Sequence, residues 1–149
     1  MRLGSEEFKN VVKNAPLVSI DFIMENGGKV LLGRRVNPPA KDYWFTIGGR
    51  IYKNETIKDA IKRILKEELG YTKETNPEFV GVFEHFYDTG YKGTPTHYVN
   101  LAYKLKDIEL GELPRAQHSR YRWFGVEELL NATDVHEYVK DYFKGSKYV

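Results

Sequence analysis

The clearest helical pattern in the sequence runs from Asn54 to Gly70. Apolar residues recur there at three- and four-residue spacing and form one face of a helix (Ile57, Ala60, Ile61, Ile64 and Leu65). Asn54 or Glu55 can begin this helix, and Gly70 can end it in the left-handed conformation after the last turn. We therefore predict an amphipathic helix whose apolar face packs on the core.

Glu68 falls on the apolar side of this helix. At about 100° per residue it lies about 20° from Ile57, inside the apolar arc. A carboxylate in that position is costly unless a cation or a donor meets it, so Glu68 is a candidate ligand. The alternative is that the last turn frays and Glu68 points to water. Glu67 and Arg63 lie four residues apart on the flank, and we expect them to form an ion pair.

Alternation of apolar and polar residues predicts strands in much of the remaining chain. Two stretches joined by Asn26-Gly27-Gly28 predict a hairpin, and two long stretches separated by a glycine-rich loop at 88–95 predict a second one. A short aromatic strand at 43–47 leads into Gly48-Gly49, which we interpret as a turn. The expected strands are 16–25, 29–33, 43–47, 77–87, 96–106 and 121–124. The expected helices are 5–13, which Ser5 can cap, 126–130 and 135–143. Hairpins with scattered helices indicate a single α+β domain over residues 1–149 with a mixed sheet.

Charged side chains near these strands are candidates for binding. Asp21 is unusual on a strand, and it is either an edge-strand charge or a group that holds a polar part of a ligand. Arg34 and Arg35 close the strand that follows the first hairpin turn, and Arg50 follows the glycine pair. Paired arginines at a strand end are commonly only solvated, but guanidinium groups also match phosphate oxygens in a two-pronged geometry.

Composition narrows the class of protein. The chain has 149 residues, no cysteine, 41% hydrophobic residues and a net charge of +2. These values predict a soluble domain without disulfides, and they give no global field that would call for nucleic acid. No apolar run has the length of a signal peptide or a membrane span, so we expect a cytoplasmic protein with no membrane partner.

The four histidines differ in their predicted surroundings. His85 and His97 lie on the second hairpin and are typical of partly buried strand histidines, whereas His136 lies on a terminal helix and is expected at the surface. His118 lies in the polar stretch 107–120, which we predict to be a loop. A loop histidine on a rigid scaffold is a candidate general base because its reference pKa lies near neutrality.

The stretch from Gly48 to Tyr71, GGRIYKNETIKDAIKRILKEELGY, resembles the box of the Nudix hydrolases. Eight positions match its spacing: Gly49, Glu55, Arg63, Leu65, Glu67, Glu68, Gly70 and Tyr71. Ile64 departs from it, because the family has a glutamate there that is often a metal ligand. The resemblance implies the α/β/α sandwich of that family, with a mixed sheet.

Further stretches resemble the GDP-mannose mannosyl hydrolases within this family: PLVSIDFI at 16–23, LLGRRVNPPAKDYWF at 31–45, GVFEHFYD at 81–88, THYV at 96–99 and QHSRYRW at 117–123. That subfamily also departs from the box at the position of Ile64. Glu67, where the subfamily is expected to have lost an acidic residue, is a departure of this chain. The resemblance implies hydrolysis of GDP-mannose, and of GDP-glucose, to GDP and the free sugar by inverting attack of water at the anomeric carbon.

The resemblance also implies roles for individual residues. Mg²⁺, with Mn²⁺ as a substitute, would be held by the carbonyl of Gly48, by Glu68 and by Gln117. Glu67, which departs from the subfamily, is a candidate for a second carboxylate near the metal. His118 would be the general base. The remaining residues would stabilise the leaving group or support the site: Arg35, Arg50, Arg63, Asp21, His85 and Tyr98. The resemblance further implies a homodimer that takes a GDP-sugar as its substrate.

Two alternatives remain open at the level of sequence. Retained Glu67 is compatible with a Nudix pyrophosphohydrolase that cleaves a nucleoside diphosphate derivative at phosphorus. Ile64 is compatible with a non-catalytic nucleotide-binding domain on the same scaffold, although Glu68, Gln117 and His118 favour an enzyme.

Overall fold

The computed structural model describes residues 3–114 and 118–144, and within them a mixed seven-stranded sheet forms the centre of the molecule. Its strands are β1 (Leu17–Asn26), β2 (Lys29–Arg35), β3 (Trp44–Phe45), β4 (Ile47–Arg50), β5 (Glu78–Tyr91), β6 (Thr94–Lys106) and β7 (His118–Gly125). The order is β3-β2-β1-β6-β5, with β4 paired to β1 and β7 paired to β2. Strands β1 and β6 run parallel, and the other pairs are antiparallel. The predicted mixed sheet is therefore confirmed.

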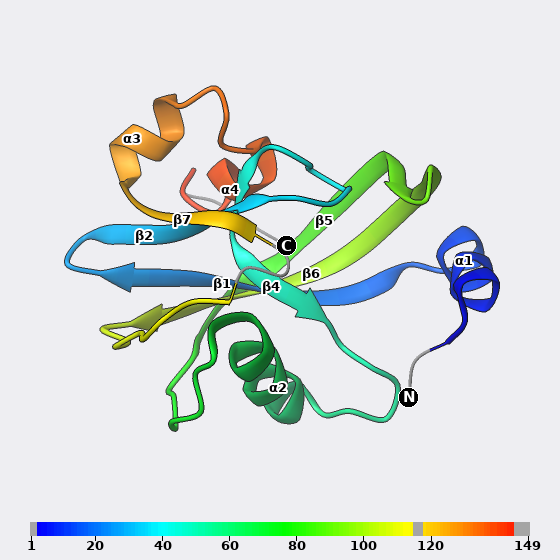
Figure 1. Ribbon diagram of the computed structural model, residues 1–149, viewed down its shortest axis with the longest axis horizontal. Helices are drawn as coiled ribbons and strands as arrows, with labels where there is room; N and C mark the ends of the chain where they lie inside the picture. Colours follow the sequence, from blue (N-terminus) through cyan, green and yellow to red (C-terminus); the bar gives the residue numbers. More distant parts are fainter. Residues whose placement is uncertain (1–2, 115–117, 145–149) are drawn as a thin grey trace.

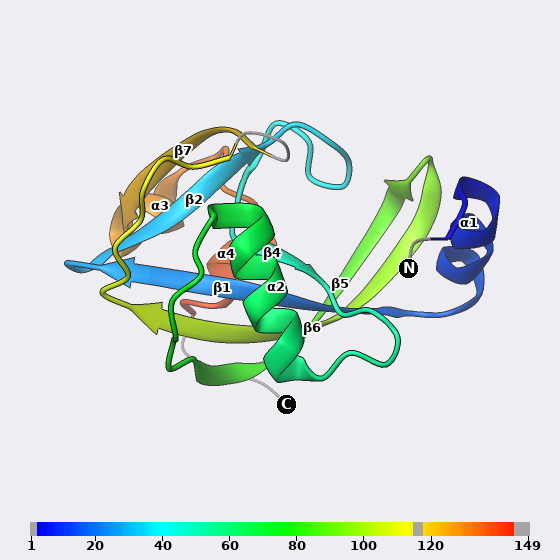
Figure 2. The same cartoon turned by 60° about the horizontal axis from the view of Figure 1, so that its bottom comes forward.

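Helices cover both faces of the sheet (Figures 1 and 2). The helix α2 (Ile57–Leu69) packs on one face and shares a core with Ile20, Phe22 and Ile47. The short helices α3 (Val126–Asn131) and α4 (Glu137–Asp141) cover the other face, where Leu129 and Val139 join a second core. These layers form the α/β/α sandwich that the resemblance implied. None of the helices in the described ranges is both long and apolar enough to cross a bilayer.

The remaining helix, α1 (Ser5–Asn14), lies apart from this sandwich, beside the hairpin of β5 and β6 (Figure 2). Its N-cap is Gly4 and Ser5 is its first residue, so the prediction that Ser5 caps this helix is wrong. Val12 is buried, whereas Val11 is exposed and Phe8 is half-buried. Only part of the predicted apolar face of this helix is therefore covered.

The prediction for α2 is confirmed at its C-terminal end and wrong at its start. Gly70 ends the helix with a φ of 66°, as its position indicated. The helix begins later than expected, because the side chain of Thr56 accepts from the backbone N–H of Asp59 and acts as the N-cap. Asn54 has a left-handed φ of 66°, which places it in the arm before the helix. Ile57 consequently lies at the first turn and is 43% exposed.

The glycine pair at 48–49 is not a turn. Both residues are extended parts of β4, which pairs with β1 so that Gly48 lies opposite Asp21. The single strand expected at 43–47 is split at Thr46, because its first half pairs with β2 and its second half pairs with β1. Glycine is required here because the backbones approach closely, not because the chain reverses direction.

Three other predicted boundaries also move. The loop expected at 88–95 is reduced to a turn at Lys92-Gly93, whose φ values of 48° and 76° allow β5 and β6 to continue almost to its ends. The helix expected at 135–143 contracts to α4, because Val135 forms a bridge with Trp44. The expected loop at 107–120 ends earlier, because His118 already belongs to β7.

Candidate active site

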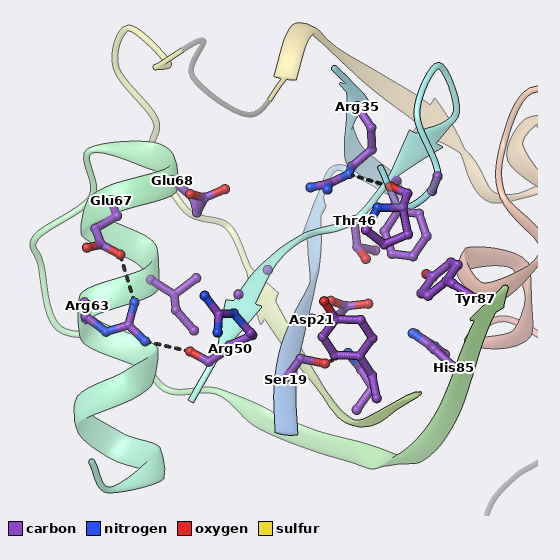
Figure 3. A pocket seen from close by; sticks show the side chains of 18 of the residues that line it. Ser19, Asp21, Arg35, Thr46, Arg50, Arg63, Glu67, Glu68, His85 and Tyr87 are labelled. Atoms are coloured by element: carbon purple, nitrogen blue, oxygen red, sulfur yellow. Dashed lines mark hydrogen bonds and ion pairs between the residues drawn. The ribbon is translucent and has the colours of Figure 1, made fainter. Parts of the chain in front are cut away.

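A cavity of about 250 Å³ opens between α2, β4 and the central strands (Figure 3). It brings together most of the predicted site residues: Asp21, Arg35, Gly48, Arg50, Arg63, Glu67, Glu68, His85 and Tyr98. Ser19, Thr46, Tyr87 and Asn100 also line it, and the sequence had not singled them out. Gln117, the predicted amide ligand, lies outside the described residues. The carboxylates of α2 and the polar residues of the strands thus face one another across this cavity.

The two glycines of β4 allow the cavity wall to form. A Cβ atom on Gly48 would lie 2.3 Å from the carbonyl oxygen of Ile20 and 2.4 Å from Oδ1 of Asp21. A Cβ atom on Gly49 would lie 3.1 Å from Cγ1 of Ile64. Because neither side chain is present, β4 runs close to both β1 and α2. This close approach brings Glu68 and Asp21 into the same cavity.

Arg63 links α2 to the preceding segment, residues 50–56, by hydrogen bonds and an ion pair. Its Nε and Nη2 donate to Glu55 at 2.7 and 3.0 Å, and its Nη1 donates to Glu67 at 2.8 Å. The Nη2 atom also donates to the carbonyl oxygen of Arg50 at 2.7 Å (Figure 3). These bonds raise the pKa of Arg63 and lower that of Glu55. The predicted pair with Glu67 is confirmed, and the pair with Glu55 shows that Arg63 also organises the site through its neighbours.

Glu68 points toward the cavity, as its place on the helical wheel predicted (Figure 3). Its side chain is 19% exposed. Burial raises its pKa, the charge of Glu67 adds to this effect, and Arg35 and Arg63 oppose it. A half-buried carboxylate that faces a cavity is destabilised until a cation or a proton reaches it. Glu68 is therefore well suited to bind a metal ion, whereas Glu67 is engaged by Arg63.

His118 is buried in β7, next to Glu68. The prediction of an open loop position is wrong, because β7 pairs with β2 and places His118 opposite Arg35. The Nε2 atom lies 4.0 Å from Oε1 of Glu68. The ring occupies the space left by the missing side chain of Gly33, whose Cβ atom would lie 2.4 Å from Nδ1. Burial and the nearby charge of Arg35 lower the pKa of His118 to about 4, so the imidazole is neutral at pH 7.

Asp21 is at the centre of a buried polar network at the inner end of the cavity. Strand β1 lies between β2 and β6, so the alternative of an edge-strand charge is wrong. The hydroxyl of Tyr142 donates to Oδ2 of Asp21 at 2.5 Å and lies 3.0 Å from Oδ1 of Asn100, whose amide donates to Ser19 at 2.8 Å. One hydroxyl proton cannot serve both acceptors, and a protonated Asp21 would satisfy both contacts. Burial raises the pKa of Asp21, which also favours its protonated form.

His85 forms the neighbouring part of this network. It is buried, its ring stacks on Tyr138 at 4.3 Å, and its Nε2 lies 3.4 Å from the hydroxyl of Tyr142. Burial lowers its pKa to about 4. His136 is not the surface residue that was expected: it caps α4 and is half-buried, with its ring 5.3 Å from that of Phe45.

The donor set is compatible with a magnesium ion at this site. Among the described residues, no three Asp, Glu or His side chains converge as metal ligands. Mg²⁺ is commonly held by one or two carboxylates together with substrate phosphates. Glu68 supplies one half-buried carboxylate, and the carbonyl of Gly48 supplies a second candidate oxygen. These oxygen donors match the preference of Mg²⁺, and Arg35 and Arg50 in the same cavity match the charge of phosphate.

Comparison with known proteins identifies the family. A family model described as the NUDIX domain matches residues 15–143. The chain belongs to the Nudix family. It is 38% identical to the low-salt glycan biosynthesis protein Agl8 of Haloferax volcanii in an alignment 144 positions long, which covers 89% of this chain and 92% of that protein. It is 29% identical to an ADP-ribose pyrophosphatase of Methanocaldococcus jannaschii, over 87% of this chain and 74% of that protein.

Solved Nudix structures share the fold. The MutT Nudix hydrolase from Burkholderia pseudomallei superposes with a TM-score of 0.74 at 20% identity, over 90% of this chain and all of that one. The NUDIX domain of Shewanella oneidensis NrtR, solved in complex with ADP ribose, gives a TM-score of 0.67 at 18% identity, over 96% and 97% of the two chains. The family supports a Nudix hydrolase activity on a nucleotide derivative for this protein.

Proposed function

We propose that this Nudix protein is a magnesium-dependent GDP-mannose hydrolase, which also acts on GDP-glucose and releases GDP and the free sugar. Water attacks the anomeric carbon with inversion, and the bond between the sugar and the diphosphate oxygen breaks. The subfamily resemblance over most of the chain motivates the substrate. The name of the Haloferax relative concerns glycan biosynthesis, a process in which nucleotide sugars are common donors.

The observation that carries the proposal is the arrangement of charge on the cavity side of α2. Ile64 packs against Gly49 where the Nudix box has a glutamate, and Arg63 engages Glu67. Glu68 is left as the half-buried carboxylate that faces the cavity, and Arg35 and Arg50 line the same cavity. This arrangement favours stabilisation of a leaving diphosphate over a carboxylate-rich site that activates water at phosphorus.

Each group of site residues has a different role in the proposed reaction. Arg35 and Arg50 bind the diphosphate and stabilise the negative charge that develops on it when the bond to the sugar breaks. A bound Mg²⁺, held by Glu68, by the carbonyl of Gly48 and, in our proposal, by Gln117, would supply further charge stabilisation. The network around Asp21, together with His85 and Tyr98, binds polar groups of the substrate. His118, neutral at pH 7, accepts the proton of the attacking water.

The test is the position of the new oxygen. GDP-mannose is hydrolysed in ¹⁸O-labelled water with Mg²⁺, and the products are examined by mass spectrometry. We expect the label in mannose and unlabelled GDP. Label in GDP, or products that are GMP and mannose phosphate, would refute attack at carbon. Glu68→Gln is the matched control that ties the hydrolysis to this site, since it keeps the size of the side chain and removes the charge that is proposed to hold Mg²⁺.

A second candidate is a Nudix pyrophosphohydrolase that cleaves at phosphorus. Glu67 lines the cavity beside Glu68, and the Methanocaldococcus relative is named an ADP-ribose pyrophosphatase. If ADP-ribose is cleaved to AMP and ribose phosphate faster than GDP-mannose is hydrolysed, this candidate replaces the first. The homodimer that the resemblance implies is also a proposal, and light scattering coupled to gel filtration tests it.

A further inference from the structure

Arg50 is held at two points by residues that come from different parts of the chain. Its carbonyl oxygen accepts from Nη2 of Arg63 at 2.7 Å, which fixes its backbone to α2. Its guanidinium carbon lies 4.2 Å from the centroid of the Phe8 ring, which belongs to α1. Within the described residues, no carboxylate or carbonyl oxygen binds the Arg50 guanidinium. The side-chain contact that orients this guanidinium is therefore a cation–π contact and not an ion pair.

Phe8 is itself held in place by the tip of the long hairpin. Its ring meets that of Tyr91 edge to face, with centroids 4.7 Å apart and an angle of 85° between the planes. The backbone N–H of Tyr91 donates to Oγ1 of Thr96 at 3.0 Å. Lys92, in the hairpin turn, donates to Oγ of Ser5 at 2.8 Å and so ties the start of α1 to the same tip. The position of Phe8 is thus fixed from the strand side as well as from the helix.

The contact with an aromatic ring suits an arginine that must bind phosphate. A guanidinium that packs its flat face on an aromatic ring keeps the N–H groups at its edge available to an anion. An arginine side chain otherwise samples many rotamers, and fixing it costs entropy when a ligand binds. Contacts that fix the side chain before binding remove part of that cost. A phenylalanine serves this purpose without competing for the donors.

The element that supplies Phe8 lies outside the region that defines the family. The family model begins at residue 15, whereas α1 ends at Asn14. The helix covers neither face of the α/β/α sandwich and lies beside the hairpin (Figure 2). Phe8 does not line the cavity itself, so its effect on a ligand passes through Arg50.

We propose that Phe8 is a positioning residue for Arg50, and that α1 therefore contributes to the active site by orienting one of its arginines. Phe8 and the hairpin tip hold the guanidinium in the orientation that binds the substrate diphosphate. This role rests on the proposed function in one respect, namely that Arg50 binds the diphosphate. The orientation of Arg50 in the free protein does not depend on that function.

The first experiment measures that orientation without any ligand. Side-chain ¹⁵N relaxation reports the order of the Arg50 Nε–H group in the wild type and in Phe8→Ala, Phe8→Leu and Phe8→Tyr. We expect Ala and Leu to increase its motion and Tyr to preserve its order, because Leu keeps apolar volume but lacks the aromatic face. Val12→Ala is the matched control, since it truncates the buried residue of the same helix and leaves the Phe8 ring intact. Unchanged order in Phe8→Ala and Phe8→Leu would overturn the proposal.

The second experiment measures the consequence for binding by titration calorimetry with GDP and Mg²⁺. Loss of a partly exposed cation–π contact should weaken GDP binding about 2- to 5-fold in Phe8→Ala and Phe8→Leu. In an Arg50→Ala background, Phe8→Ala should cause no further loss. Equal losses in both backgrounds, or a similar loss in Val12→Ala, would show a merely structural role. If the wild type binds no GDP, the proposed function fails, and the relaxation experiment still decides the role of Phe8.

Discussion

Acid should destabilise this protein through His85. The side chain is 3% exposed, its ring stacks on Tyr138, and burial lowers its pKa from 6.5 to about 4, with Asp141 opposing the shift. The unfolded chain therefore takes up the proton first as the pH falls. The stability that neutral His85 contributes is present above pH 6.5 and is lost as the pH falls toward 4. The gap between the two pKa values corresponds to about 3 kcal/mol when fully expressed, and to about 2 kcal/mol at pH 5.

Urea unfolding at pH 8, 6 and 5 tests this value in the wild type and in His85→Gln, which cannot titrate. Between pH 8 and pH 5 the wild type should lose about 2 kcal/mol more than the variant. Other buried groups, such as His118, are present in both proteins and cancel in the difference. The Cε1 proton of His85 gives an independent check, because its NMR titration in the folded protein should centre near pH 4. Parallel stability curves for the two proteins, or a titration centred near 6.5, would refute the reasoning.

Three further outcomes are expected. Gly48→Ala should destabilise the fold by about 2–4 kcal/mol in urea unfolding, because its Cβ atom would meet the backbone of Ile20, which cannot move aside. Gly111→Ala is the control, because a Cβ atom at Gly111 meets no other atom. A loss of stability near zero in Gly48→Ala would contradict this reasoning. Tyr142→Phe should cost about 1–3 kcal/mol, because it removes the buried hydroxyl that bonds to Asp21 and contacts Asn100, and unchanged stability would argue against the network. His118→Gln should lower kcat about 100-fold or more at pH 7 with little change in KM, and a retained kcat would remove His118 as the base.

The parts of the site that depend on short-range pattern could be predicted from the sequence. The three- and four-residue spacing placed Glu68 on the core side of α2, and it placed Arg63 beside Glu67. Gly70 ended the helix where a left-handed residue was expected. In each case the relevant neighbours lie within one or two helical turns, so the periodicity of the helix determines their geometry.

The parts that depend on distant contacts could not be predicted. Tyr142 is separated from Asp21 by 121 positions, and no local pattern links the two residues. The glycine pair was interpreted as a turn because glycine is common in turns, whereas its cause is the close approach of β1 and α2 to β4. His118 was placed in a loop because its surroundings are polar, although pairing between β2 and β7 extends the sheet to include it.

Ile64 connects the packing of the fold with its chemistry. The residue is almost fully buried and belongs to the core that holds α2 on the sheet, yet it also lines the cavity. It therefore lies at the boundary between the core and the site, with Gly49 leaving the space for its branched side chain. A carboxylate at this boundary would add negative charge one turn before Glu68, whereas isoleucine adds none. Arg35 and Arg50 line the same cavity. The proposed function therefore assigns Ile64 two effects: it completes the core, and it leaves a balance of charge in the site that favours an anionic leaving group.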